Sequence, residues 1–208
     1  MHVLGYCLPE DHPDLTAMLD QARAARSERG RLIVERVNRL GVPIEYADVE
    51  KVADGATIGR PHVARVLIDR GIVKGFDEAF DRFLGRGRPA FVPKQLPEFD
   101  EVSALVRRIG GITALAHPRD RATRGLLVDL KARGLDGVEV HHPSHSNEVR
   151  RRVAALAASL DLVPTGGSDW HGEDAAGPTH TVIGGEPVPV EWLDAMEARA
   201  MSHRSASG

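Results

Sequence analysis

The fold of this chain is decided by the stretch Leu162-Val163-Pro164-Thr165-Gly166-Gly167-Ser168-Asp169-Trp170-His171-Gly172. Its apolar start predicts a short buried strand, and the two glycines lead into an Asp and a His one residue apart. Loops at the C-terminal ends of parallel strands present catalytic groups in α/β folds. Carboxylate oxygen and imidazole nitrogen are the donors that zinc, manganese and iron accept. For this stretch alone, a competing interpretation is a glycine-rich turn in which Asp169 caps a helix and His171 lies at the surface.

Composition excludes several classes of protein. The chain has 208 residues, enough for one sizeable core, and a formal net charge of −3, which argues against tight binding of duplex nucleic acid. A single cysteine, Cys7, excludes an internal disulfide and suits a reducing cytoplasm. The first residues lack the pattern of a signal peptide, and no apolar run is long enough to span a membrane. We therefore expect a cytoplasmic protein with no membrane partner.

The first half of the chain is expected to be mostly helical. Apolar residues recur at helical spacing over 13–40, 44–52 and 76–84, and Pro61 suits the first turn of a further helix. Arg60 and His62 flank this helix start, where free N–H groups and the helix dipole favour an anion. An alternative of equal weight is that Arg60 is simply an exposed residue and His62 a partly packed one at the start of a helix. We interpret residues 9–95 as a helical insertion.

After Pro97, strands and helices alternate, which is typical of βαβ units. Strands are predicted at residues 2–6, 112–116, 137–141, 162–165 and 181–184, and helices at 98–109, 125–133, 147–159 and 192–201. Residues 202–208 are predicted to be a disordered tail. The pattern therefore predicts an α/β domain made of residues 1–8 and 96–201.

Three successive predicted strands each end in a loop that carries histidine. The loops are His117-Pro118, His141-His142-Pro143-Ser144-His145 and Asp169-Trp170-His171. Parallel strands bring their C-terminal ends to one rim, so these groups are expected to face a common site. Packing alone explains three such loops poorly, and we favour a metal site. Glu139 lies inside its strand and is expected to be a structural carboxylate or to support a metal ligand.

Taken in order, five motifs resemble the polymerase-and-histidinol-phosphatase (PHP) family of metal-dependent phosphoesterases. They are His-Val-Leu-Gly-Tyr, Ile-Gly-Arg-Pro-His, Gly-Gly-Ile-x-x-Leu-Ala-His-Pro, Glu-Val-x-His-Pro-Ser-His and Gly-Ser-Asp-x-His. The chain looks most similar to the bacterial branch that dephosphorylates 3′,5′-nucleoside bisphosphates and trims RNA 5′ ends. The resemblance implies a distorted (β/α)7 barrel, a helical insertion over the active site and up to three divalent ions (Mn, Zn or Fe).

The resemblance also assigns roles to residues. As metal ligands it implies His2, His117, Asp169 and His171. Arg60 and His62 look like contacts to the substrate phosphate, and Arg119 and His145 are further candidates for that role. The substrate implied is a nucleotide or a short RNA 5′ end.

The sequence departs from the family pattern at its start. The family motif His-x-His, followed by an Asp, a further His and a bridging Glu, has no counterpart before His2. We therefore expect an incomplete barrel, weak and substoichiometric metal binding and impaired phosphoesterase activity in this chain. Alternatives are a non-catalytic remnant that binds a nucleotide or partner, and one half of a split enzyme. Sheet edges exposed by an incomplete barrel would favour self-association or binding of the missing N-terminal half.

Overall fold

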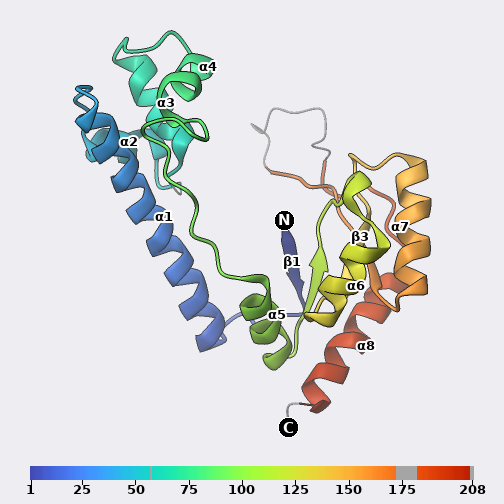
Figure 1. Cartoon of the computed structure of the whole chain (residues 1–208). Coiled ribbons are helices and arrows are strands. Elements are labelled where there is room, and N and C mark those ends of the chain that lie inside the picture. Colours follow the sequence, from blue (N-terminus) through green and yellow to red (C-terminus); the bar gives the residue numbers. More distant parts are fainter. Residues whose placement is uncertain (57, 172–181, 207–208) are drawn as a thin grey trace. The chain divides into compact units, whose positions relative to one another are not determined.

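The computed structural model describes residues 1–56, 58–171 and 182–206. The chain forms two compact units, which we call the sheet unit (Met1–Leu15 with Glu98–Gly208) and the helical unit (Thr16–Pro97) (Figure 1). The first boundary lies inside helix α1 (Pro13–Arg39), and the second follows Pro97. That the helical unit covers the active site stays a prediction.

The helical unit contains most of α1 together with α2 (Tyr46–Ala53), α3 (Arg60–Asp69), α4 (Phe76–Ala79) and the π-helical turn η1 (Phe80–Leu84). Apolar residues at helical spacing give each longer helix one buried face. The core of this unit includes Ile33, Val37, Val63, Leu67 and Leu84, each with no exposed side-chain surface or almost none. These apolar faces pack together without a strand among the described residues of the unit.

The sheet unit has a four-stranded sheet in the order β1-β2-β3-β4. The strands are β1 (Val3–Tyr6), β2 (Ile112–Leu115), β3 (Gly137–His141) and β4 (Val163–Gly166). β2, β3 and β4 are parallel, whereas β1 is antiparallel to β2, with Val3 opposite Leu115. The N-terminal end of β1 therefore lies beside the C-terminal end of β2. This topology places His2 at the same rim as the loops that follow the parallel strands.

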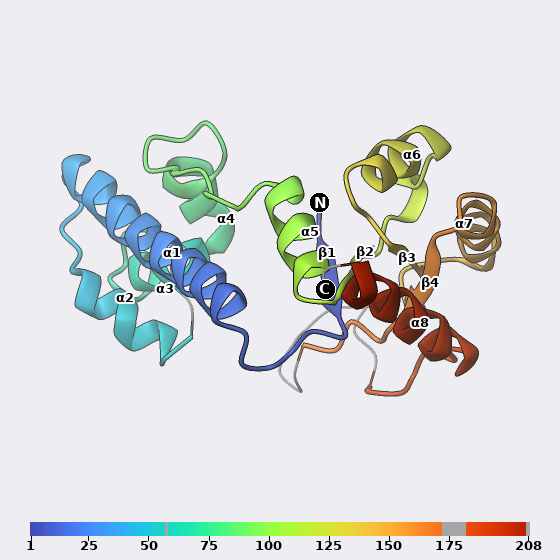
Figure 2. The same cartoon turned by 90° about the horizontal axis from the view of Figure 1, so that it is seen from below.

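Helices surround this sheet (Figure 2). α5 (Phe99–Arg108) packs against β2, α7 (Asn147–Ser159) against β3 and β4, and α8 (Glu191–Ala206) against β4 and β2. The core combines residues of the strands, of α7 and of α6 (Arg124–Ala132), namely Leu127, Leu130, Val138, Val140, Val153 and Ala157. Alternating helices and parallel strands confirm the predicted α/β class. No helix of the described residues combines the length and apolar character of a membrane span.

The expected strand at residues 181–184 is wrong for the part that is described. Val182 to Gly185 form a turn, in which the Gly185 N–H donates to the Val182 carbonyl at 2.9 Å. Val182 and Ile183 are 73% and 72% exposed, so their apolar character reflects no buried strand. Thr181 lies outside the described residues.

The expected disordered tail is wrong for residues 202–206, because α8 continues to Ala206. Side chains at the end of α8 are tied to the sheet unit. The imidazole of His203 lies 2.8 Å from the carboxylate of Asp136, and Arg204 donates to the carbonyl of Gly110 at 3.2 Å. Gly110 has a positive φ of 77°, and a Cβ there would meet the Arg204 side chain, so glycine suits this position on both counts.

Candidate metal centre and phosphate contacts

His2 and His117 meet at the rim of the sheet. The Ala116 N–H donates to the His2 carbonyl at 3.0 Å, which extends the β1–β2 pairing by one step. The two rings then approach edge to face, with His2 Nδ1 3.0 Å from His117 Nε2. Two imidazole nitrogens at this separation can both turn toward a cation between them.

The row of donors continues from His117 through His142 to Asp169. The rings of His117 and His142 have their centroids 5.3 Å apart, and His142 Nε2 lies 3.4 Å from Asp169 Oδ2. These residues follow β2, β3 and β4, the three parallel strands. The structure therefore brings together groups from all three loops, as the strand pattern predicted.

His142, which sequence reasoning did not assign, is the buried member of this row, with 1% of its surface exposed. Its Nδ1 accepts the Ser144 N–H at 3.0 Å, so in the neutral ring the proton is on Nε2 and faces Asp169. Burial, the largest cause, lowers the pKa of His142 and favours that neutral form. The Nε2–H of His142 therefore faces the Asp169 carboxylate at 3.4 Å, a distance longer than that of a well-formed hydrogen bond.

Glu139 supports the backbone of His117. Its side chain is nearly buried, and Oε2 accepts the His117 N–H at 2.6 Å. Burial raises the pKa of Glu139 to about 7, against the lowering effect of that hydrogen bond and with smaller raising effects from Asp169 and Glu186. A divalent cation nearby would favour the ionised carboxylate. Glu186, whose carboxylate lies 2.9 Å from Arg150 Nη2, is a further acidic residue near Glu139 that the sequence did not indicate.

Three non-glycine residues at this rim have a left-handed backbone. His117, Arg119 and Asp169 have φ of 31°, 51° and 53°. Such conformations cost free energy and concentrate at functional sites. Their occurrence in the loops after β2 and β4 supports a functional interpretation of the rim.

The remaining predicted residues of this unit have well-defined surroundings. His171 turns back on its own loop, with Nδ1 2.6 Å from the Asp169 carbonyl and 3.8 Å from Asp169 Oδ1. His145 is 3% exposed, accepts the Arg119 N–H at Nε2 (3.2 Å) and lies 2.9 Å from the Val140 carbonyl through Nδ1. Both ring nitrogens of His145 thus face main-chain groups. Arg119 is exposed, and its Nε donates to the Ser144 hydroxyl at 2.9 Å.

Arg60 and His62 lie at the start of α3 in the helical unit. His62 Nδ1 accepts the Gly59 N–H at 3.2 Å and so caps the helix. The guanidinium of Arg60 donates to the Leu84 carbonyl at 3.1 Å and lies over the rings of Phe80 and Phe91, at 5.2 and 5.5 Å from their centroids. Arg60 is therefore held firmly, and His62 has a structural role as well as its predicted one.

The donor chemistry of the rim fits a divalent metal, because the row combines the imidazole nitrogens of three histidines with the carboxylate oxygens of Asp169. Within residues 1–56, 58–171 and 182–206, however, no group of three or more His, Cys, Asp or Glu side chains is arranged to hold a metal ion. The described donors stand in pairs, His2 with His117 and His142 with Asp169. Metal roles for individual residues stay a prediction.

Known proteins resemble the chain over most of its length. It is 33% identical over 176 residues to a 5′-3′ exoribonuclease of Haemophilus influenzae and 31% identical over 191 residues to a 3′,5′-nucleoside bisphosphate phosphatase of Chromobacterium violaceum. These alignments cover 82% and 85% of this chain, which spans 64% of the length of each of the two relatives. No protein-family model matches the chain.

A solved structure extends this similarity to the fold. A candidate metal-dependent phosphoesterase from Bifidobacterium adolescentis is 31% identical, with a TM-score of 0.71, and the match covers 95% of this chain and 71% of that one. Sequence and fold thus agree over more than two thirds of a solved relative. The chain belongs to the PHP-type metal-dependent phosphoesterases.

Proposed function

We propose that this protein is a divalent-metal-dependent phosphoesterase that releases phosphate from 3′,5′-nucleoside bisphosphates. The observation that carries the proposal is the row His2, His117, His142 and Asp169 at one rim of the sheet. Support comes from the two relatives named for RNA and nucleoside bisphosphates. Trimming of RNA 5′ ends is the second candidate, favoured by the similarity to the exoribonuclease.

In this proposal His2, His117, Asp169 and His171 bind manganese, zinc or iron weakly, with a correspondingly reduced phosphoesterase activity, because His2 with His117 and His142 with Asp169 stand only in pairs among the described residues. Such ions, when bound, activate water and neutralise charge on phosphate oxygens. The neighbouring residues hold these ligands in place, because Glu139 accepts the His117 N–H and the Nε2–H of His142 faces Asp169. Positioning groups of this kind are worth about 10–100-fold in metal affinity or activity.

Phosphate recognition is assigned to Arg60, His62, Arg119 and His145. Arg119 presents an exposed guanidinium beside the row, and its backbone is held by His145. A guanidinium can donate two parallel hydrogen bonds to a phosphate group. Given the main-chain partners of His145, we assign it the positioning of Arg119, and Arg60 offers a second fixed cation in the helical unit.

The substrate is tested by supplying two phosphate compounds to the purified chain with Mn²⁺. Release of inorganic phosphate from a nucleoside 3′,5′-bisphosphate supports the first candidate, and stepwise release of nucleoside monophosphates from a 5′-phosphorylated oligoribonucleotide supports the second. His117→Ala should lower kcat/KM by at least about 100-fold, beyond the loss seen for supporting residues. His12→Asn, a histidine change outside the row, serves as control. Equal rates in both variants would contradict the proposal.

We also propose that the chain self-associates through a sheet edge. β1 and β4 are the outer strands of the sheet among the described residues. An edge strand offers a ladder of backbone groups to another chain. Sedimentation equilibrium should therefore show an average mass that rises with concentration, and one monomer mass at all concentrations would contradict this.

A further inference from the structure

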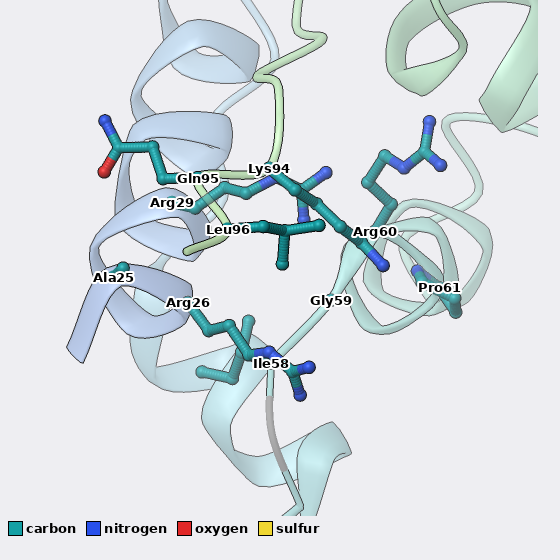
Figure 3. Close-up of a pocket in the computed structure, with 10 residues that line it drawn as sticks. All are labelled: Ala25, Arg26, Arg29, Ile58, Gly59, Arg60, Pro61, Lys94, Gln95 and Leu96. Carbon is teal, nitrogen blue, oxygen red and sulfur yellow. The ribbon is translucent and has the colours of Figure 1, made fainter. Parts of the chain in front are cut away.

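A basic cavity of about 340 Å³ lies within the helical unit (Figure 3). Three segments line it: α1, the start of α3 and the segment after Val92. The lining residues are Ala25, Arg26, Arg29, Ile58, Gly59, Arg60, Pro61, Lys94, Gln95 and Leu96. All three segments belong to one compact unit, so the cavity is complete without the sheet unit.

The charged side chains that line this cavity are all positive. Arg26, Arg29, Arg60 and Lys94 line it, and none of its described lining residues is acidic. α3 also begins here, with no acidic residue in its first turn, so the positive end of its dipole adds to the field. Like charges collected in a concave surface raise the local concentration of anions.

Arg29 is the fixed element of the cavity. It is only 9% exposed, and its Nε donates to the Val92 carbonyl at 2.8 Å. Burial is the main cause that lowers the pKa of Arg29, and the charge of Arg60 adds to it. The two guanidinium groups therefore repel each other. A bound anion would reduce that repulsion and compensate for the burial of Arg29.

Around this fixed pair the wall is exposed and partly apolar. Arg26 and Lys94 are exposed, and Figure 3 shows their side chains extending from α1 and from the connecting segment toward the start of α3. Leu96, 59% exposed, lies beside them and offers apolar surface for a base or ribose. Several cations around one cavity suit the repeated phosphates of an oligonucleotide backbone better than one inorganic phosphate.

We propose that this cavity is a binding site for single-stranded RNA, in which Arg26, Arg29 and Lys94 contact backbone phosphates. The choice of RNA as the anion rests on the proposed function. The binding itself requires no metal and no residue of the sheet unit. This site would let the protein hold an oligoribonucleotide more tightly than a mononucleotide.

The test is fluorescence anisotropy of a 3′-labelled single-stranded oligoribonucleotide with the full chain in EDTA, over a range of salt concentrations. Each phosphate contact to a single strand contributes about 0.7 to the slope of log K against log salt. The double variant Arg26→Gln/Lys94→Gln should therefore lower that slope by about 1.4 and weaken binding roughly tenfold at low salt. Both positions are exposed, so the fold should survive the changes, which circular dichroism checks.

The matched control is Arg39→Gln, an exposed arginine of the same helix outside the cavity, which should bind RNA as the wild type does. Equal slopes and affinities for the double variant and Arg39→Gln, or no binding by the wild type in EDTA, would overturn the inference. Phosphate release from a nucleoside bisphosphate by the wild type is measured in parallel. Variant-sensitive binding without turnover defeats only the proposed function, and turnover with variant-insensitive binding defeats only this inference.

Discussion

Replacing Asp136 by Ala tests how the sheet unit holds its last helix. The Asp136 side chain is fully buried just before β3. Its Oδ2 accepts the Thr113 N–H at 3.1 Å, and its Oδ1 lies 2.9 Å from Arg107 Nη2 and 2.8 Å from His203 Nε2. One carboxylate thus joins β2, α5 and α8.

The cost of Asp136→Ala follows from what each partner can do without it. Thr113 has no exposed surface, so its N–H stays without an acceptor, at about 1–3 kcal/mol. His203 loses one hydrogen bond, worth about 0.5–1.5 kcal/mol. The Arg107 side chain is 40% exposed and regains water, so its ion pair is discounted to about 0–1 kcal/mol. The expected total is about 1.5–5.5 kcal/mol.

Urea unfolding followed by tryptophan fluorescence measures this loss selectively, because both tryptophans, Trp170 and Trp192, belong to the sheet unit. Asp129→Ala, which removes an exposed ion pair with Arg133, is the control and should cost less than about 1 kcal/mol. His203→Ala should lower the free energy of unfolding only by the value of its own hydrogen bond, about 0.5–1.5 kcal/mol. If Asp136→Ala unfolds like Asp129→Ala, the carboxylate does not hold these elements together, and the reasoning fails.

Three further predictions concern the site. His142→Phe keeps a ring but loses the Nε2–H that faces Asp169, so Mn²⁺ affinity measured by titration calorimetry should fall about 10–100-fold, and an unchanged affinity would refute the positioning role. The pKa of Glu139 is raised to about 7 in the folded chain, so its contribution to stability is fully present below its unfolded pKa of about 4.5 and is lost as pH rises through about 7. In metal-free buffer the unfolding free energy of the wild type should therefore fall relative to Glu139→Gln between these pH values, and a constant difference would count against the raised pKa. Arg60→Ala should raise KM and lower kcat for a nucleoside bisphosphate. The loss in kcat/KM corresponds to about 2–5 kcal/mol if the phosphate contact is desolvated. Unchanged kinetics would leave Arg60 with only its packing on Phe80 and Phe91.

Sequence reasoning located the elements whose signals are local. The helix predicted at residues 147–159 and the strand at 137–141 match α7 and β3, because their apolar periodicity coincides with clear boundaries. It failed where tertiary contacts decide. Ser202 to Ala206 carry no strong apolar pattern, yet they stay helical because His203 and Arg204 are anchored by groups distant in sequence.

The candidate site likewise has features that the sequence predicts and features that only tertiary contacts decide. The closeness of His117 to the other two loops could be predicted, because parallel strands bring their C-terminal ends to one rim of the sheet. The role of His142 could not be read in this way. The β3–β4 pairing is irregular between Glu139 and His141, so strict alternation does not show which histidine faces the rim. In the structure His141 lies against Trp192, with ring centroids 5.1 Å apart, and His142 joins the row.

The measurement that tests the central claim most directly is the metal dependence of phosphate release from a nucleoside 3′,5′-bisphosphate. The account predicts that release by the purified chain stops in EDTA, returns when Mn²⁺ is added in excess, and is lost in His117→Ala but kept in His12→Asn. It places the reaction at the rim where His2, His117, His142 and Asp169 meet. Release that continues undiminished in EDTA, or that survives His117→Ala, would contradict it.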